Sequence, residues 1–308
     1  MEEVKEILII GAGPAGLTAA IYAARGGSKP FVIGGVQPGQ LMTSYEVENY
    51  PGFPEKLGGP QLIDNMVKQA EKFGAKIIQR DVTAVDFSSR PFKVEAGDAV
   101  YRARAVIIAT GASPRWIGLE SEQRLIGRGV SSCATCDGFF FRDRDVVVVG
   151  GGDAAMEETL FLARITRSVT VIHRRDKLRA ERILQERAFE NQKIRFQWNS
   201  VVEEILGENL VEGVRIKNVK TGEISELECQ GVFVAIGYKP NTEIFRGKVE
   251  MDEKGYINVK DTTGTSVEGV FVAGDAYDYV YRQAVTAAAS GCRAAIDVVK
   301  YLESIETP

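Results

Sequence analysis

Two of the four cysteines stand close enough in the sequence to act as a pair. Cys133 and Cys136 are separated by two residues, whereas Cys229 and Cys292 each stand alone. Residues i and i+3 lie on one face of a helix, where two sulfurs can close a small disulfide ring. A helix start also stabilises a thiolate. The pair is therefore suited to redox chemistry.

The sequence leaves other uses of this pair open. A structural zinc site takes about four ligands and would need a second close pair, a structural disulfide is rare in the cytosol, and two inert buried cysteines would fit the same spacing. Asp137 directly follows Cys136. Its carboxyl group can carry a proton for the sulfur chemistry, or it can favour a helix start through the helix dipole. The spacing does not separate these two roles.

A glycine-rich turn near the N-terminus has the residue types of a nucleotide site. Gly11-x-Gly13-x-x-Gly16 lies between an apolar run and an Ala-rich run. The first glycine of such a motif permits a tight turn, the second admits a pyrophosphate, and the third lets helix and strand pack closely. We interpret it as a dinucleotide site rather than an ordinary turn. The acid usual about 20 residues later is missing, because the next apolar run ends at Gly34.

A second glycine motif, Gly150-x-Gly152-x-x-Ala155, has the permitted alanine in its third position. The segment after its second strand is basic and carries His173, Arg174, Arg175 and Arg179. An acid at that place favours the ribose 2′-hydroxyl of NAD, whereas arginines favour the 2′-phosphate of NADP. A solvated basic helix start is the alternative. The position at the strand end favours an NADPH site.

Two short motifs near the C-terminus are weaker signals. Gly274-Asp275 closes an apolar run, where a carboxylate can accept a hydrogen bond from a cofactor sugar or cap a helix. Arg282-Gln283-Ala284 opens the next predicted helix, whose N–H groups could meet a flavin oxygen or a phosphate.

Parallel strands must present these motifs, because nucleotide-binding turns lie where a strand ends and a helix begins. Short apolar runs predict buried strands, and Ala-rich runs predict helices. The predicted strands are residues 6–10, 30–33, 145–149 and 169–172, the predicted strand-and-turn segments are 105–111, 231–237 and 269–275, and the predicted helices are 17–25, 156–163 and 282–302.

Two copies of one strand–turn–helix–strand unit predict an α/β fold with two Rossmann-like dinucleotide-binding domains, the second inserted into the first. Pro114 and Pro240 each follow a strand that ends in glycine, which suits a chain crossing between domains. We expect residues 1–113 and 241–308 to form the first domain and residues 114–240 the second.

The composition excludes several classes of protein. Of 308 residues, 44% are hydrophobic and 26% charged, as in a folded globular protein. A net charge of −4 argues against a nucleic-acid binder, and a single histidine excludes a His-rich metal site. No apolar run reaches the roughly 20 residues of a membrane span, and residues 1–6 are unlike a signal peptide. We therefore expect a cytoplasmic protein without a metal or a membrane partner.

The motifs occur in an order that resembles the low-molecular-weight thioredoxin reductases, which are FAD-containing pyridine nucleotide–disulfide oxidoreductases. The resemblance runs nearly end to end and rests on Gly11-Ala12-Gly13-Pro14-Ala15-Gly16, Pro38-Gly39-Gln40-Leu41, Glu46-Val47-Glu48-Asn49-Tyr50-Pro51-Gly52, Ala109-Thr110-Gly111-Ala112, Cys133-Ala134-Thr135-Cys136-Asp137-Gly138-Phe139-Phe140, the Gly150 turn, His173-Arg174-Arg175-Asp176, Gly274-Asp275-Ala276 and Tyr281-Arg282-Gln283-Ala284.

The resemblance implies binding residues for two cofactors. It assigns FAD binding to Gly11, Gly13, Gly16, the loop from Gly34 through Gly39 to Gln40, Asn49, Asp275, Arg282, Gln283 and Ala284. It assigns NADPH binding to Gly152, Asp153, Ala154, His173, Arg174, Arg175 and Arg179. Further cofactor-binding positions are Ala15, Leu41, Val82, Ala109, Thr110, Gly111 and Gly274. The family also has glycine where the acid is missing, and it often has asparagine in place of Asp153.

The resemblance also implies a reaction. NADPH reduces FAD, FAD reduces a Cys133–Cys136 disulfide, and the dithiol reduces thioredoxin. Cys136 would lie nearer the flavin, Cys133 would attack thioredoxin, and Asp137 would be the acid. Because one domain carries both the nicotinamide and the disulfide, the family rotates that domain, with hinges expected near residues 111–114 and 237–241. A homodimer is usual in the family.

Other functions remain as alternatives. An FAD-dependent dithiol oxidase has a similar fold, but it needs no 2′-phosphate site, so the arginines argue against it. The flavoprotein component of alkyl hydroperoxide reductase has an extra N-terminal disulfide domain, which we do not expect here. A reductase of another thioredoxin-like protein and a non-catalytic redox sensor also fit the motifs.

Overall fold

Two parallel sheets organise the computed structural model, which describes residues 3–36, 39–44 and 46–306. The chain divides into unit 1, formed by Met1–Ser113 and Lys239–Pro308, and unit 2, formed by Pro114–Tyr238. Unit 2 thus interrupts unit 1 in sequence, and the α/β fold class is confirmed.

Unit 1 contains a sheet in the order β3-β2-β1-β6-β5-β4, with β17 also paired to β6. Strands β1, β2, β3, β6 and β17 run parallel, and β4, β5 and β6 form an antiparallel meander. The strands are β1 (Val4–Ile10), β2 (Pro30–Gly34), β3 (Lys76–Gln79), β4 (Val82–Asp86), β5 (Phe92–Ala96), β6 (Ala99–Ile108) and β17 (Val270–Val272).

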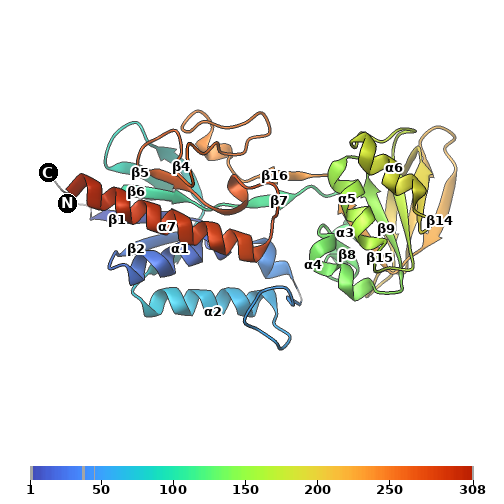
Figure 1. Cartoon of the computed structure of the whole chain (residues 1–308), viewed down its shortest axis with the longest axis horizontal. Coiled ribbons are helices and arrows are strands. Elements are labelled where there is room, and N and C mark those ends of the chain that lie inside the picture. The colour runs from blue at the N-terminus through green and yellow to red at the C-terminus, as the bar shows by residue number, and fades with distance from the viewer. Residues whose placement is uncertain (1–2, 37–38, 45, 307–308) are drawn as a thin grey trace. The chain divides into compact units, whose positions relative to one another are not determined.

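The parallel part of this sheet is buried on both faces, as its continuous apolar runs predict. Ile7 and Ile9 of β1 pack with the helices α1 (Pro14–Arg25) and α7 (Ala284–Glu306). Leu8 of β1 packs on the opposite face, with side chains of the meander and of the segment around Phe245. Figure 1 shows α1 and α7 side by side along the sheet, with α2 (Gly59–Lys72) beyond α1.

Unit 2 contains a five-stranded parallel sheet in the order β11-β10-β9-β15-β8 and an antiparallel sheet in the order β12-β13-β14. The strands are β8 (Val130–Ser131), β9 (Asp145–Gly150), β10 (Ser168–His173), β11 (Ile194–Trp198), β12 (Ser200–Leu206), β13 (Gly213–Asn218), β14 (Ile224–Glu228) and β15 (Gly231–Ala235).

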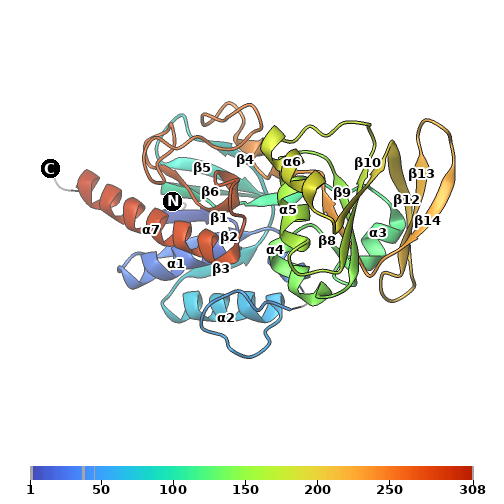
Figure 2. The same ribbon diagram turned by 45° about the vertical axis from the view of Figure 1, so that its right-hand side comes forward.

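Alternate residues of β9 serve the two faces of the parallel sheet in unit 2. Val148 packs with the helices α5 (Asp153–Leu162) and α6 (Arg182–Glu190). Val147 packs on the other face with Val214 of β13. Figure 2 shows α5 and α6 in front of the parallel sheet and the β12-β13-β14 sheet to one side. The unit is therefore a layer of helices, a parallel sheet and a smaller sheet.

The remaining short elements connect these layers. They are the helices α3 (Glu120–Leu125) and α4 (Ala134–Asp137), the 3₁₀ helices η1 (Gln40–Thr43), η2 (Gly138–Phe141), η3 (Glu243–Phe245) and η4 (Gly274–Ala276), and the strands β7 (Ala112–Pro114) and β16 (Tyr238–Pro240). Among the helices of the described residues, none is long and apolar enough to span a bilayer.

The two chain crossings pair with each other as β7 and β16. The first crossing follows Ser113 and the second follows Tyr238. Within unit 1, the Asn241 amide donates to the Gly111 carbonyl over 2.9 Å. Within unit 2, the Arg115 amide donates to the Gly237 carbonyl over 2.8 Å. In each unit, a backbone hydrogen bond therefore joins the two chain segments next to the crossings.

Helix starts differ from the prediction where a side chain or the backbone sets the boundary. The first helix begins at Pro14 rather than residue 17, because proline suits the first helical position. Helix α5 likewise begins at Asp153 rather than residue 156. Helix α7 begins at Ala284 rather than residue 282, since Arg282 has a φ of +50°, which is incompatible with the helix.

Candidate cofactor and redox sites

The first glycine motif lies where strands of unit 1 end together. The Gly11 amide donates to the Ile33 carbonyl of β2, and the Ala109 amide donates to the Ile10 carbonyl of β1, both over 2.8 Å. The Ala273 amide, which follows β17, donates to the carbonyl at the end of β6 over 2.8 Å. Ligands of open parallel sheets bind outside these carboxyl ends.

Gly11 and Gly13 have different physical reasons to be glycine. Gly11 has a φ of +115°, and a Cβ there would lie 2.2 Å from the Ala109 carbonyl oxygen. A Cβ on Gly13 would meet nothing within 4 Å. Gly13 therefore leaves free space at the start of α1, where amide groups and the helix dipole favour a phosphate. This space fits the pyrophosphate of a dinucleotide.

Buried polar atoms at the same strand ends also fit a cofactor with hydroxyl groups. Thr110 Oγ1 is buried without a hydrogen-bond partner among the described residues. Asp275 is partly buried, and this burial raises its pKa to about 6, against the opposing effect of Arg282. A buried polar group without a partner is costly. The residues of unit 1 thus fit FAD, whose ribityl and ribose hydroxyls can supply the missing bonds.

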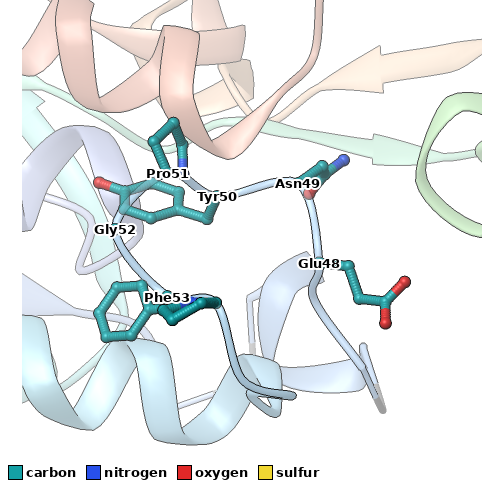
Figure 3. Close-up of a pocket in the computed structure, with 7 residues that line it drawn as sticks. Glu48, Asn49, Tyr50, Pro51, Gly52 and Phe53 are labelled. Carbon is teal, nitrogen blue, oxygen red and sulfur yellow. The ribbon is translucent and has the colours of Figure 1, made fainter.

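The loop after η1 brings Asn49 to the start of α7. Asn49 Nδ2 donates to Gln283 Oε1 over 3.3 Å. The loop lines an open depression of about 480 Å³, bounded by Glu48, Asn49, Tyr50, Pro51, Gly52, Phe53 and Pro54 (Figure 3). Figure 3 shows the rings of Tyr50 and Phe53 on one side of the loop, and their centroids are 6.3 Å apart. Asn49 and Gln283, far apart in sequence, are therefore neighbours.

The loop after β2 is held by residues that sequence reasoning missed. The Arg80 amide donates to the Gly34 carbonyl over 2.7 Å, and the Val36 amide donates to Asp81 Oδ1 over 2.9 Å. Both residues follow β3, so the end of a third parallel strand was the available signal. They lie directly before Val82, which opens β4.

Of the other predicted positions of unit 1, some lie in or beside η1 and one packs inside the glycine turn. Gly39 precedes η1, which contains Gln40 and Leu41, while Pro38 lies outside the described residues. Ala15 is buried, and its Cβ lies 2.9 Å from where a Cβ on Gly274 would stand, so it packs inside the turn.

Unit 2 repeats the glycine arrangement of unit 1. A Cβ on Gly150 would lie 2.4 Å from the Ala235 carbonyl oxygen at the end of β15, while a Cβ on Gly152 would meet nothing within 4 Å. Helix α5 begins at the next residue, Asp153, followed by Ala154. This turn therefore offers a second pyrophosphate space, on a different sheet.

The basic segment after β10 has both buried and exposed side chains. Leu178 and Ala180 are buried in the core of unit 2 and anchor the segment. Arg174, Arg175 and Arg179 are exposed. Their guanidinium groups are therefore available to a phosphate, as an NADPH site requires.

His173 lies apart from the arginines, in the interior. Only 5% of it is exposed, and its Nε2 lies 3.0 Å from the Lys177 carbonyl oxygen. A Cβ on Gly151 would stand 2.3 Å from His173 Nδ1, so the ring fills the place of a side chain there. Burial lowers the pKa of His173 and favours the neutral ring. The imidazole thus supports the turn.

The two paired cysteines form a disulfide at the start of α4. The Cys133–Cys136 bond joins Cα atoms 5.3 Å apart, and Cys133 is the N-cap residue. Cys133 is half-buried and Cys136 is exposed. Burial raises the pKa of the free Cys229 to about 12, so that thiol is inert near neutral pH. Within the described residues, no three His, Cys, Asp or Glu side chains group as metal ligands.

Ser131 connects this disulfide to Asp137. Its hydroxyl donates to Asp137 Oδ2 over 2.5 Å and accepts the Cys133 amide over 3.0 Å. Burial raises the pKa of Asp137, while the bond from Ser131 opposes that rise. Asp137 therefore holds its proton to higher pH than an exposed aspartate. A serine two residues before a cysteine carries no sequence signal, so this contact was not predictable.

Comparisons with known proteins agree with this geometry. A family model described as pyridine nucleotide-disulphide oxidoreductase matches residues 5–291. The thioredoxin reductase of Rickettsia conorii is 54% identical over 308 residues, which cover 98% of this chain and 99% of that protein. The thioredoxin reductase of Streptomyces coelicolor is 51% identical, covering 99% of this chain and 96% of that protein.

Solved structures give the same result. The crystal structure of thioredoxin reductase from Streptococcus pyogenes MGAS5005 has a TM-score of 0.94 at 43% identity, covering 99% of this chain and 100% of that one. The chain belongs to the pyridine nucleotide-disulphide oxidoreductase family.

Proposed function

We propose that this protein is an NADPH-dependent thioredoxin reductase that uses FAD. The observation that carries the proposal is a closed Cys133–Cys136 disulfide, with a protonatable Asp137 beside it, on the same unit as three exposed arginines at a nucleotide-binding turn. Full-length similarity to thioredoxin reductases supports it.

Each unit binds one cofactor in this proposal. Unit 1 holds FAD along the turn at Gly13, with Asp275 and Thr110 facing its hydroxyl groups. Unit 2 holds NADPH along the turn at Gly152, with the arginines on its 2′-phosphate. FAD supplies the relay that takes a hydride from NADPH and passes two electrons to the disulfide.

The reduced cysteine pair acts by thiol–disulfide exchange. The N-cap position favours a thiolate at Cys133, which attacks one sulfur of the thioredoxin disulfide and expels the other as a thiolate. Cys136 then attacks the Cys133 sulfur of the mixed disulfide, which restores the internal disulfide and releases thioredoxin as a dithiol. Asp137 holds a proton beside the pair for these transfers.

A rotation of unit 2 would let the nicotinamide and the disulfide use the flavin in turn. Both are carried by unit 2, and each must reach the same flavin ring. The paired strands β7 and β16 carry the two crossings and suit a hinge. We propose further that the enzyme is a homodimer in the cytoplasm, where the reducing compartment matches its dithiol product.

Titration of the purified yellow protein tests the function. Anaerobic NADPH should bleach the flavin absorbance, and NADH should require a much higher concentration. Thioredoxin should then be reduced by the wild-type protein, while Cys136→Ser should keep flavin reduction and lose thioredoxin reduction. A colourless protein that gains no absorbance with FAD, or a Cys136→Ser variant that still turns over thioredoxin, would contradict the proposal.

A further inference from the structure

The arginine segment of unit 2 is fastened to the glycine turn through its backbone. The Arg179 amide donates to the Gly151 carbonyl over 2.7 Å. The Glu181 amide donates to Asp153 Oδ1 over 2.6 Å. These two bonds join the segment that carries the exposed guanidinium groups to the turn at the start of α5. The distance between the two phosphate-binding elements is therefore fixed at Arg179 itself and again two residues later, at Glu181.

Asp153 differs from the other contacts because it brings a negative charge. Asp153 occupies the first position of α5, beside the free space at Gly152. Its side chain is on the surface, because the residue is exposed. An anion placed at Gly152 and at the arginines meets this carboxylate as a like charge. The same side chain thus holds the segment in place and weakens the attraction for a phosphate.

We propose that Asp153 is a specificity-determining positioning residue that sets the preference of this site for a 2′-phosphate. Its hydrogen bond to the Glu181 amide holds Arg179 in place for the 2′-phosphate, and its charge opposes the bound phosphates. This inference rests on the proposed NADPH site of unit 2. Asparagine and alanine separate its two effects, because asparagine keeps the acceptor without the charge and alanine removes both.

Calorimetric binding to the FAD-loaded protein tests the proposal without turnover. The probes are adenosine 2′,5′-bisphosphate and 5′-AMP. We expect Asp153→Asn to bind the bisphosphate roughly two- to fourfold more tightly than the wild type, since one like charge is removed. We expect Asp153→Ala to bind it about three- to tenfold more weakly than Asp153→Asn, with less than about a twofold difference for 5′-AMP.

Asp176 provides the matched control on the same segment. Its exposed carboxylate accepts a bond from Lys220 Nζ over 2.8 Å and does not join the segment to the glycine turn. Asp176→Asn and Asp176→Ala should therefore bind the bisphosphate equally. A difference between these two variants as large as that between the Asp153 variants would overturn the assignment.

Hydrogen exchange of peptides that contain Glu181 gives a second readout. Its amide should exchange faster in Asp153→Ala than in Asp153→Asn. Equal bisphosphate affinity of the two Asp153 variants, equal losses for both probes, or no gain in Asp153→Asn would refute the proposal. If the wild type binds 5′-AMP as tightly as the bisphosphate, the NADPH site itself is wrong, and the exchange result still reports on the Asp153 contact.

Discussion

At the scale of single residues, Ser131 sets how firmly Asp137 holds its proton. The Ser131 hydroxyl bonds to the Asp137 carboxylate, and such a bond favours the charged form. Burial favours the neutral form and dominates, so the pKa of Asp137 is raised. A step that needs the neutral acid is fast at low pH and loses rate as the pH rises through this pKa.

Replacing Ser131 by alanine should move that loss of rate to higher pH. Without the hydroxyl the carboxylate is less stabilised, so the pKa of Asp137 rises further. Measured pH profiles of thioredoxin reduction should show the falling limb displaced upward in Ser131→Ala and absent in Asp137→Asn. Ser132→Ala, the neighbouring serine, is the control and should keep the wild-type profile. A downward displacement in Ser131→Ala would contradict the role of Ser131.

The second residue-scale prediction concerns Asp275 in FAD-free protein. Its folded pKa is about 6 against an ordinary 3.8, so the folded state binds the proton more tightly than the unfolded state. Stability should therefore fall as the pH rises from about 4 to 6, and the loss should be complete above 6. Asp275→Asn should raise the unfolding free energy of the apoprotein at pH 7.5 by on the order of 1–3 kcal/mol.

Thermal unfolding of the apoprotein at several pH values checks this prediction. The advantage of Asp275→Asn should vanish below about pH 3, where the wild-type carboxyl is mostly neutral in both states. Asp98→Asn removes an exposed carboxylate and should change nothing. The same Asp275→Asn substitution should weaken FAD retention, because the amide oxygen of asparagine is a weaker acceptor for the cofactor hydroxyls than a charged carboxylate. An equal advantage at all pH values would show that the charge of Asp275 is not the cause.

At the scale of elements, both units place a glycine against a neighbouring strand and another beside free space. Gly11 stands against the Ala109 carbonyl in unit 1, and Gly150 stands against the Ala235 carbonyl in unit 2. Gly13 and Gly152 face open space. The first position of each motif therefore serves the fold, and the second serves the ligand.

Alanine at Gly11 and at Gly13 should separate these two roles. Gly11→Ala puts a Cβ 2.2 Å from a backbone oxygen at a positive φ, so we expect a loss of at least about 1–3 kcal/mol in unfolding free energy. Gly13→Ala should keep the secondary structure and unfolding midpoint of the apoprotein while FAD binding weakens. Circular dichroism and flavin absorbance check both. Equal destabilisation by the two variants would contradict the distinction.

The strands and turns were the most predictable elements, because buried parallel strands are continuous apolar runs and their turns need glycine. The predicted start of α7 was wrong. The left-handed backbone at Arg282 depends on tertiary contacts, which a local sequence pattern does not show. The contact of Ser131 with Asp137 joins different elements, so sequence spacing could not reveal it. The contact of Asp81 with Val36 was indicated only by the position of Asp81 at the end of a third parallel strand. The sequence also does not show that His173 lies in the interior, because its burial depends on contacts with other elements.

At the scale of the whole molecule, unit 2 is bounded by two adjacent chain ends. The Arg115 amide bonds to the Gly237 carbonyl, and the apolar clusters on both faces of the parallel sheet are formed by residues of unit 2 itself. A unit that has its own hydrophobic core and adjacent chain ends meets the requirements of a domain that folds alone.

We expect residues 114–238, expressed alone, to fold cooperatively and bind adenosine 2′,5′-bisphosphate without FAD. Calorimetry and thermal unfolding measure both properties. Arg174→Ala with Arg175→Ala in this fragment should lose about tenfold or more in affinity at an unchanged unfolding midpoint, because exposed side chains carry the binding. An unfolded fragment would show that unit 2 depends on the rest of the chain.

The interruption of unit 1 also has a consequence for protein synthesis. The ribosome delivers the strands β1, β2 and β6 first, but β17 and α7 leave it only after the whole of unit 2 has been translated. At typical elongation rates this delay is on the order of ten seconds. During that time the alanine-rich face of α1, which α7 later covers, is without its partner helix. A nascent chain of this protein thus presents a half-covered sheet to the chaperones of the cell well before its first domain can close.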